Sequence, residues 1–148
     1  MKNRVLLILV GCILLITGCV NNSNNNSTND TKESDIEMTN IKVIINDKTY
    51  MLKLENNKTV YEFLELLPQE FMMNELNGNE KYFYMNDSLT TDSYYPKHID
   101  AGDVMLYGDN CLVIFYKSFD TSYSYTKIGH IDNLEDLGNG NMMVKFEK

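Results

Sequence analysis

Six consecutive residues, Cys-Leu-Val-Ile-Phe-Tyr at positions 111–116, constrain the fold of this chain more than any other segment. Gly108-Asp109 precedes this run and Lys117-Ser118 follows it, so it has the length of a strand and is short for a helix. Because successive side chains of a strand point to opposite faces, such a strand is apolar on both faces. We therefore predict that residues 111–116 form a central strand that is covered on both sides.

Other short runs rich in β-branched and aromatic residues are separated by turn-forming residues. Residues 59–68 differ, because their apolar side chains recur at helical spacing, with Thr59 and Glu62 at the spacing of a capping box. A helical turn is also predicted near residues 133–137. Seven or eight strands with one clear helix favour a β-barrel or a β-sandwich. The expected strands are residues 41–45, 49–54, 71–76, 80–85, 104–107, 111–116, 123–130 and 141–146.

The N-terminus has the pattern of a bacterial lipoprotein signal. A short basic region precedes an apolar run over residues 5–16, which has the length of a signal-peptide core and is too short to span a bilayer comfortably. Residues 16–19, Ile-Thr-Gly-Cys, resemble the lipobox at which lipoprotein signal peptidase cleaves. We predict a signal peptide over residues 1–18 and lipid on Cys19. An ordinary secretory signal or a membrane-anchored helix is the alternative.

Residues 19–39 are predicted to be the lipidated cysteine and a disordered, Asn/Ser-rich tether, since they have almost no apolar content and no periodicity. The folded domain is expected over residues 40–148, which suffices for one core but not for two. We expect a monomer, attached to the cell membrane through the lipid on Cys19, with its domain outside the cytoplasm. Cys111 is the sole cysteine of this domain, so an internal disulfide is excluded.

The net charge of −8 argues against a nucleic-acid partner. A domain this acidic repels the phosphates of nucleic acids and anionic lipid head groups. The only arginine, Arg4, lies in the predicted signal peptide, so the mature chain would contain none. Tryptophan is absent from the whole sequence.

Five segments together resemble a known family. They are IKVIINDKTY, ELLP, MNELNGNEKYFYM, AGDVMLYGDNCLVIFY and SYSYTKIGHID, in this order. The series resembles the bacterial cyclophilin-like domain family, whose members are often made as lipoproteins, and the resemblance covers residues 40–148. It implies a mostly β fold: a closed antiparallel cyclophilin-like β-barrel with one or two short capping helices.

The same resemblance raises the question of peptidyl-prolyl cis-trans isomerase activity. Cyclophilin isomerases use an arginine in a strand that, by the resemblance, corresponds to residues 72–76, and here that segment carries Glu75 instead. Lysine does not replace the planar, two-pronged donor of arginine. We therefore predict a non-catalytic module that binds a peptide or a small ligand. The alternatives are an isomerase acting on exported proteins and an accessory domain of redox or transport proteins.

Tyrosines are the residues that we expect to contact a ligand, because a tyrosine buries its ring and keeps a hydroxyl for hydrogen bonding. The alternative is that they fill the barrel core and its rim. Within the resemblance, the counterpart of the cyclophilin groove would be formed by Glu75, Tyr82, Tyr84, Tyr107, Phe115 and Tyr123.

Other chemistries have little support in the sequence. Cys111 would need His98 or His130 as a base, and its place in an apolar strand predicts a core residue instead. The serines lack the context of a hydrolase nucleophile. The acidic segment 132–136 lacks the alternate-residue spacing of a calcium loop, and the histidines have no zinc-like partners. We predict no catalytic residue, no metal and no cofactor.

Overall fold

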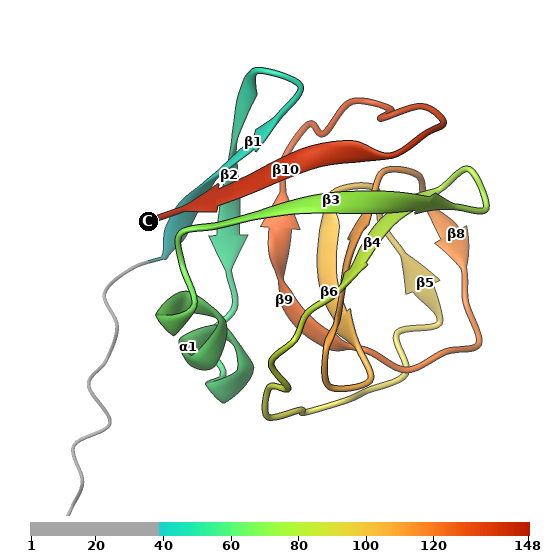
Figure 1. Ribbon diagram of the computed structural model, residues 1–148. Helices are drawn as coiled ribbons and strands as arrows, with labels where there is room; N and C mark the ends of the chain where they lie inside the picture. Colours follow the sequence, from blue (N-terminus) through green and yellow to red (C-terminus); the bar gives the residue numbers. More distant parts are fainter. Residues whose placement is uncertain (1–38) are drawn as a thin grey trace, which may run out of the picture. The chain divides into compact units, whose positions relative to one another are not determined.

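The structure, a computed structural model, describes residues 39–148; the predicted signal peptide, Cys19 and nearly all of the predicted tether lie outside this part. Eight strands form a closed antiparallel barrel in the order β1-β10-β3-β4-β7-β6-β9-β2 (Figure 1), which confirms the predicted fold class. β5 and β8 pair with each other in a separate two-stranded sheet. The elements are β1 (Asn40–Ile45), β2 (Lys48–Leu54), α1 (Lys58–Glu65), β3 (Gln69–Leu76), β4 (Glu80–Tyr84), β5 (His98–Ile99), β6 (Asp103–Tyr107), β7 (Cys111–Phe115), β8 (Phe119–Asp120), β9 (Thr126–Ile131) and β10 (Met142–Glu147).

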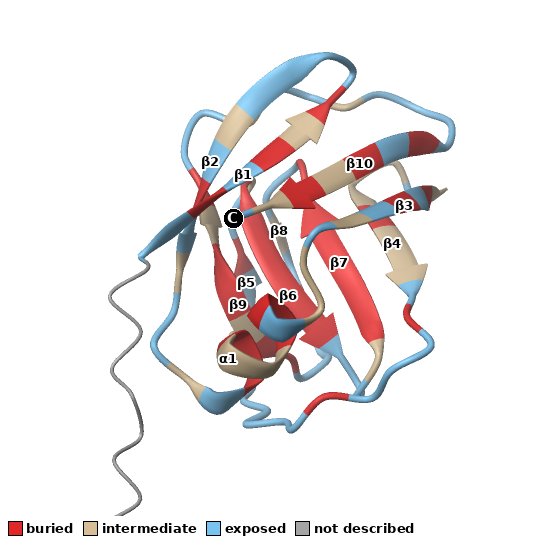
Figure 2. Cartoon of the chain, turned by 60° about the vertical axis from the view of Figure 1, so that its left-hand side comes forward, coloured by how far each residue is buried: buried red, intermediate tan, exposed pale blue. Residues whose placement is uncertain are grey.

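β7 is buried along its whole length, as predicted, because its two faces pack in different hydrophobic clusters (Figure 2). Leu112 and Ile114 belong to the inner cluster, which fills the barrel. The outward face belongs to an outer cluster, which lies between the barrel and the β5–β8 pair. The buried members of the outer cluster are Ile99, Met105, Cys111, Val113, Phe115 and Tyr125.

α1 covers one end of the barrel (Figure 1) and adds Val60, Phe63 and Leu64 to the inner cluster. The ring of Phe63 meets that of Phe146 edge to face, with 5.5 Å between the centroids. The apolar side chains of α1 form one stripe along the helix, and this stripe is buried against the barrel interior. The burial explains why a single short helix is stable here. Within residues 39–148, no helix has the length and apolar character needed to cross a membrane.

The predicted capping box of α1 is wrong. Asn57 is the N-cap, and its side chain accepts a hydrogen bond of 2.9 Å from the amide of Val60. Thr59 and Glu62 instead bind the loop that follows β4: the Thr59 hydroxyl donates to the Thr90 carbonyl at 2.6 Å, and the Glu62 carboxylate accepts from the Thr90 amide at 2.5 Å. Contacts with a distant loop therefore take up both side chains that the local pattern had paired.

The connection between β9 and β10 covers the other end of the barrel (Figure 1). The helical turn predicted near residues 133–137 is absent, and this prediction is wrong. Leu134 and Leu137, whose spacing suggested a helix, pack against the inner cluster from an irregular segment. Asn133 and Gly138 have positive φ angles of 55° and 62°, which interrupt a right-handed helix.

A buried lysine holds this connection in place. Lys81 of β4 is 0% exposed, and its ammonium group donates hydrogen bonds to the carbonyls of Gly138 at 2.6 Å and Gly140 at 2.8 Å. The same group lies 4.9 Å from the centroid of the Tyr116 ring. Burial lowers the pKa of Lys81, because removal from water disfavours the charged form.

We expect Lys81→Ala to lower the free energy of unfolding by about 2–4 kcal/mol, because it removes charge-assisted hydrogen bonds and leaves a cavity. Urea denaturation followed by tyrosine fluorescence measures the change. Lys42→Ala, at an exposed position of β1, serves as the control and should change stability by at most about 0.5 kcal/mol. Equal losses in the two variants would contradict the structural role of Lys81.

Candidate functional site

A groove of about 410 Å³ lies on the outside of the barrel along β4 and β7. β4 contributes Glu80, Tyr82 and Tyr84, which point to the same outer face because they occupy alternate positions of one strand. Cys111 and Val113 line the groove from β7, which pairs with β4. The strand pairing thus brings a carboxylate, two phenols and an apolar surface together.

The other side of the groove is built by β6, β8 and the segment before β9. The Tyr107 ring of β6 lies edge to face with the Tyr123 ring at 5.9 Å and 5.7 Å from the Tyr125 ring. Aromatic rings therefore stand on both sides of the β7 surface. The remaining lining residues are Leu76, Asn77, Asn79, Phe119, Asp120, Thr121 and Ser122.

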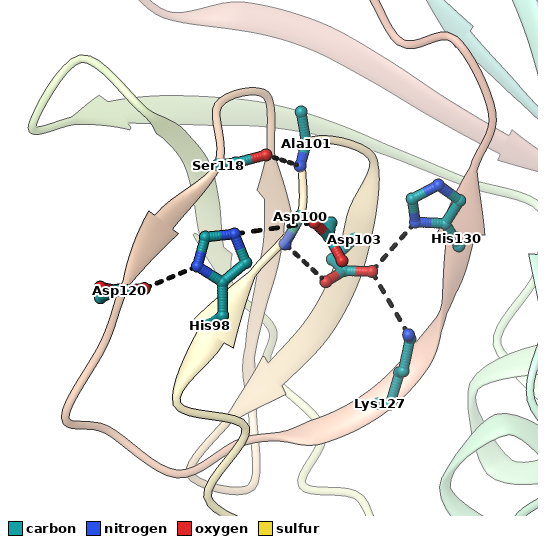
Figure 3. A network of polar contacts seen from close by, with 8 residues as sticks. All are labelled: His98, Asp100, Ala101, Asp103, Ser118, Asp120, Lys127 and His130. Atoms are coloured by element: carbon teal, nitrogen blue, oxygen red, sulfur yellow. Dashed lines mark hydrogen bonds and ion pairs between the residues drawn. The ribbon is translucent and has the colours of Figure 1, made fainter.

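The β5–β8 pair that forms part of this side is held by polar contacts (Figure 3). The Nδ1 atom of His98 on β5 lies 2.6 Å from the Oδ1 atom of Asp120 on β8. This hydrogen bond to the carboxylate raises the pKa of His98. The amide of Ala101 donates to the Ser118 hydroxyl at 2.9 Å, which joins the segments after β5 and before β8. Asp120 thus lines the groove while already paired with a histidine.

Asp103 fastens the Ala-Gly-Asp turn before β6 to β9 (Figure 3). Its buried carboxylate lies 3.0 Å from His130 Nδ1 and 3.4 Å from Lys127 Nζ, and it accepts a hydrogen bond of 3.0 Å from the Asp100 amide. Gly102 has a φ of 101°, a conformation that favours glycine. Both histidines of residues 39–148 are therefore paired with an aspartate carboxylate. Within this range, no group of three or more His, Cys, Asp and Glu residues is arranged to hold a metal ion.

Glu80 is the groove residue with the clearest electrostatic signature. Burial raises its pKa to about 7, and repulsion by the Glu75 carboxylate acts in the same direction. Its environment in the described part of the chain supplies no basic neighbour or hydrogen bond that would favour the ionised form. Glu80 is therefore poised to gain or lose a proton near neutral pH.

Cys111 is free and packs in the outer cluster, as predicted for a core residue, although it also lines the groove. Burial raises the pKa of its thiol to about 11, so the thiol stays protonated at neutral pH. Because the thiolate is the nucleophilic form, this environment disfavours nucleophilic chemistry at Cys111.

Four of the six predicted groove residues line the groove: Tyr82, Tyr84, Tyr107 and Tyr123. The other two do not. Glu75 accepts hydrogen bonds from the Gly78 amide at 2.5 Å and the Tyr116 hydroxyl at 3.3 Å, which engage it at the β3–β4 turn. Phe115 is 0% exposed, and its ring lies 5.6 Å from the Phe119 ring of the β5–β8 pair. A β5–β8 cover over this end of β7 was not predicted from the sequence.

Sequence reasoning missed Glu80, Asn79 and Tyr125 as groove residues. The two-residue alternation of β4 was a signal for Glu80, since it shares a face with Tyr82 and Tyr84. No local pattern indicates Asn79 or Tyr125, because their positions depend on how a turn and a loop lie against the barrel.

A comparison with known protein families matches residues 43–147 to the cyclophilin-like family. The chain belongs to this family. The resemblance seen in the five sequence segments is thereby confirmed. A search of curated proteins finds no match. The groove is thus a feature of a cyclophilin-like domain, on the outer face of its barrel.

We expect Glu80→Gln to be more stable than the unchanged protein at pH 8. The folded protein holds the Glu80 proton up to a pKa of about 7, whereas the unfolded chain releases it near 4.5, so stability falls as the pH rises between these values. The expected gain is about 1–2 kcal/mol, below the full linkage value because water in the groove reaches the carboxylate.

Urea denaturation at pH 4 and pH 8 measures this difference, which should vanish at the lower pH. Glu65→Gln, at an exposed position of α1, removes the same charge and is the control. A gain at pH 8 of the same size in both variants would show that the acidity of the whole chain, and not the environment of Glu80, is responsible.

Proposed function

We propose that the protein is a non-catalytic binding module that holds an extended peptide or a small ligand in the groove along β4 and β7. The observation that carries the proposal is the groove of about 410 Å³ with tyrosines on both sides. This volume is typical of ligand sites, and tyrosines provide apolar contact together with hydrogen-bonding hydroxyls. Because the groove lies on the outer face of the barrel, an extended chain can approach it from solvent.

The composition of the groove supports binding without catalysis of proline isomerisation. Residues 39–148 contain no arginine, and no lysine or histidine lines the groove. The positive donor that would stabilise the rotating amide is therefore missing from its lining. The fold by itself carries no activity, because the same architecture accommodates unrelated functions.

We also propose that the domain is displayed outside the cytoplasm on a lipid attached to Cys19. The support is the sequence pattern of residues 1–19: a basic start, an apolar run and a lipobox-like Ile-Thr-Gly-Cys. The polar composition of the residues after Cys19 suits a spacer between a membrane and a folded domain.

We expect the groove to bind the peptide acetyl-Gly-Ala-norleucine-Pro-Ala-Gly-amide, whose norleucine and proline match its apolar and aromatic lining. Chemical-shift titration of the full-length chain in non-ionic detergent measures the dissociation constant. Tyr82→Ala should weaken binding at least about fivefold, because a large contact surface is lost. Tyr61→Phe, on α1 outside the groove, should leave it unchanged. Absence of shifts around Val113 and Tyr125 would refute the proposal.

The same sample tests catalysis. Uncatalysed rotation about the norleucine–proline bond takes tens to hundreds of seconds, so the cis and trans forms of the peptide give separate signals without exchange peaks. We expect no exchange peaks when the protein is added. Exchange peaks that disappear with Tyr82→Ala or Glu75→Ala would instead support the isomerase.

We expect Cys19→Ser to shift the protein from the membrane fraction to the soluble fraction, because the residue that carries the lipid is lost. Cell fractionation measures the distribution, and N-terminal sequencing of the unchanged protein should show cleavage before Cys19. Cys12→Ser, inside the predicted signal peptide, is the control. Unaltered membrane attachment of Cys19→Ser would disprove lipidation at this site.

A further inference from the structure

We propose that the groove selects peptides that insert an alkylammonium group, as a lysine side chain does, at the end of the groove formed by Glu80 and Asn79. This inference rests on the proposed binding function and specifies the chemistry of its ligand. It is carried by three features of the groove: a carboxylate and an amide oxygen that have no hydrogen-bond partner among residues 39–148, facing aromatic rings, and apolar side chains between them.

The polar groups at this end of the groove require a donor. Glu80 and Asp120 are the acidic lining residues, and Asp120 is already paired with His98. The amide oxygen of Asn79, next to Glu80 in the chain, is buried and has no hydrogen-bond partner among residues 39–148. A buried acceptor without a partner is costly, so a ligand donor beside Glu80 gains affinity if the Asn79 side chain turns its oxygen toward the groove. An ammonium group supplies three donors and a positive charge.

The aromatic and apolar lining suits the rest of such a side chain. The rings of Tyr82 and Tyr84 meet edge to face at 5.8 Å, and a second edge-to-face pair is formed by Tyr107 and Tyr123 at 5.9 Å. Ring faces attract cations. Val113 lies between the walls at the floor of the groove, and the exposed rings of Tyr84, Tyr107 and Tyr123 offer surface on which the methylene groups of lysine pack while the ammonium group reaches the acceptors.

Proton linkage gives the inference a distinctive signature. A bound cation favours the ionised form of Glu80, whose pKa in the free protein is about 7, so affinity for an alkylammonium group should increase from pH 6 to pH 8. His98 is paired with the groove residue Asp120, and this hydrogen bond raises the pKa of His98, so a Glu80 variant is needed to assign the pH effect to Glu80. Several titratable groups surround Glu80. They are Glu75 on β3, Tyr82 and Tyr84 on β4, Tyr107 on β6, Cys111 on β7, Tyr116 directly after β7, Asp120 on β8, and Tyr123 and Tyr125 before β9.

The experiment compares two peptides that differ in a single group. The first is the norleucine peptide, and the second has lysine in place of norleucine. Both are titrated into the full-length chain in non-ionic detergent at pH 6, 7 and 8. We expect the lysine peptide to bind at least about fivefold more tightly at pH 8, with the preference shrinking at pH 6. Glu80→Gln should abolish this preference, and Glu65→Gln should retain it.

Each outcome bears on a different claim. Equal affinity for the two peptides would overturn the alkylammonium inference and leave the proposed binding function standing, whereas binding of neither would overturn both. A lysine preference that survives Glu80→Gln would place the ammonium group elsewhere on this acidic protein. The pH series on the unchanged chain needs no variant to fold, and a preference that stays constant from pH 6 to pH 8 would also overturn the inference.

Discussion

Burial of β7 on both faces is the constraint on which the rest of the structure depends. Its inward residues, Leu112 and Ile114, are removed from water only because the sheet closes into a barrel with α1 over one end. Its outward residues need a second cover: the β5–β8 pair lies over Phe115, whereas Cys111 and Val113 are buried among the outer cluster and form the floor of the groove. The groove lies over the part of this outer face that the β5–β8 pair does not reach, so the fold and the candidate site have the same physical origin.

Polar groups that are partly or fully removed from water fall into two kinds. Those with hydrogen-bond or ion-pair partners stabilise the fold, and those without such partners are candidates for contact with a ligand. Lys81 and Asp103 are completely or almost completely buried, and each has partners that offset its loss of hydration. Glu80 and Asn79 lack such compensation: the carboxylate has a raised pKa, and the amide oxygen has no partner within the described residues. Uncompensated polar groups are expected where a ligand completes the site.

Membership of the cyclophilin-like family accounts for the barrel but does not decide what the groove does. The groove is lined by carboxylates, phenols and amides, with no basic side chain. The proposal that the groove recognises a donor-rich, positively charged ligand rests on this lining. The functional proposal therefore follows from the side chains that line the barrel surface, and the acidic character of the chain acts in the same direction.

The sequence by itself determined the central strand and a fold of short strands, a barrel or a sandwich, because two-residue alternation and turn residues are local signals. The resemblance to the cyclophilin-like family, and not local spacing, selected the closed barrel and the groove tyrosines of β4. Tertiary structure decided the N-cap at Asn57, the irregular segment where a helical turn was predicted, and the engagement of Glu75 at its own turn. It also covered Phe115 and raised the pKa of Glu80. The Asn57 cap and the Glu75 contact with Gly78 are local hydrogen bonds, but Thr59 and Glu62 are held by Thr90, far along the chain, which leaves the cap to Asn57. The cover over Phe115 and the pKa of Glu80 depend on packing and on the loss of water around a group, which local spacing does not encode.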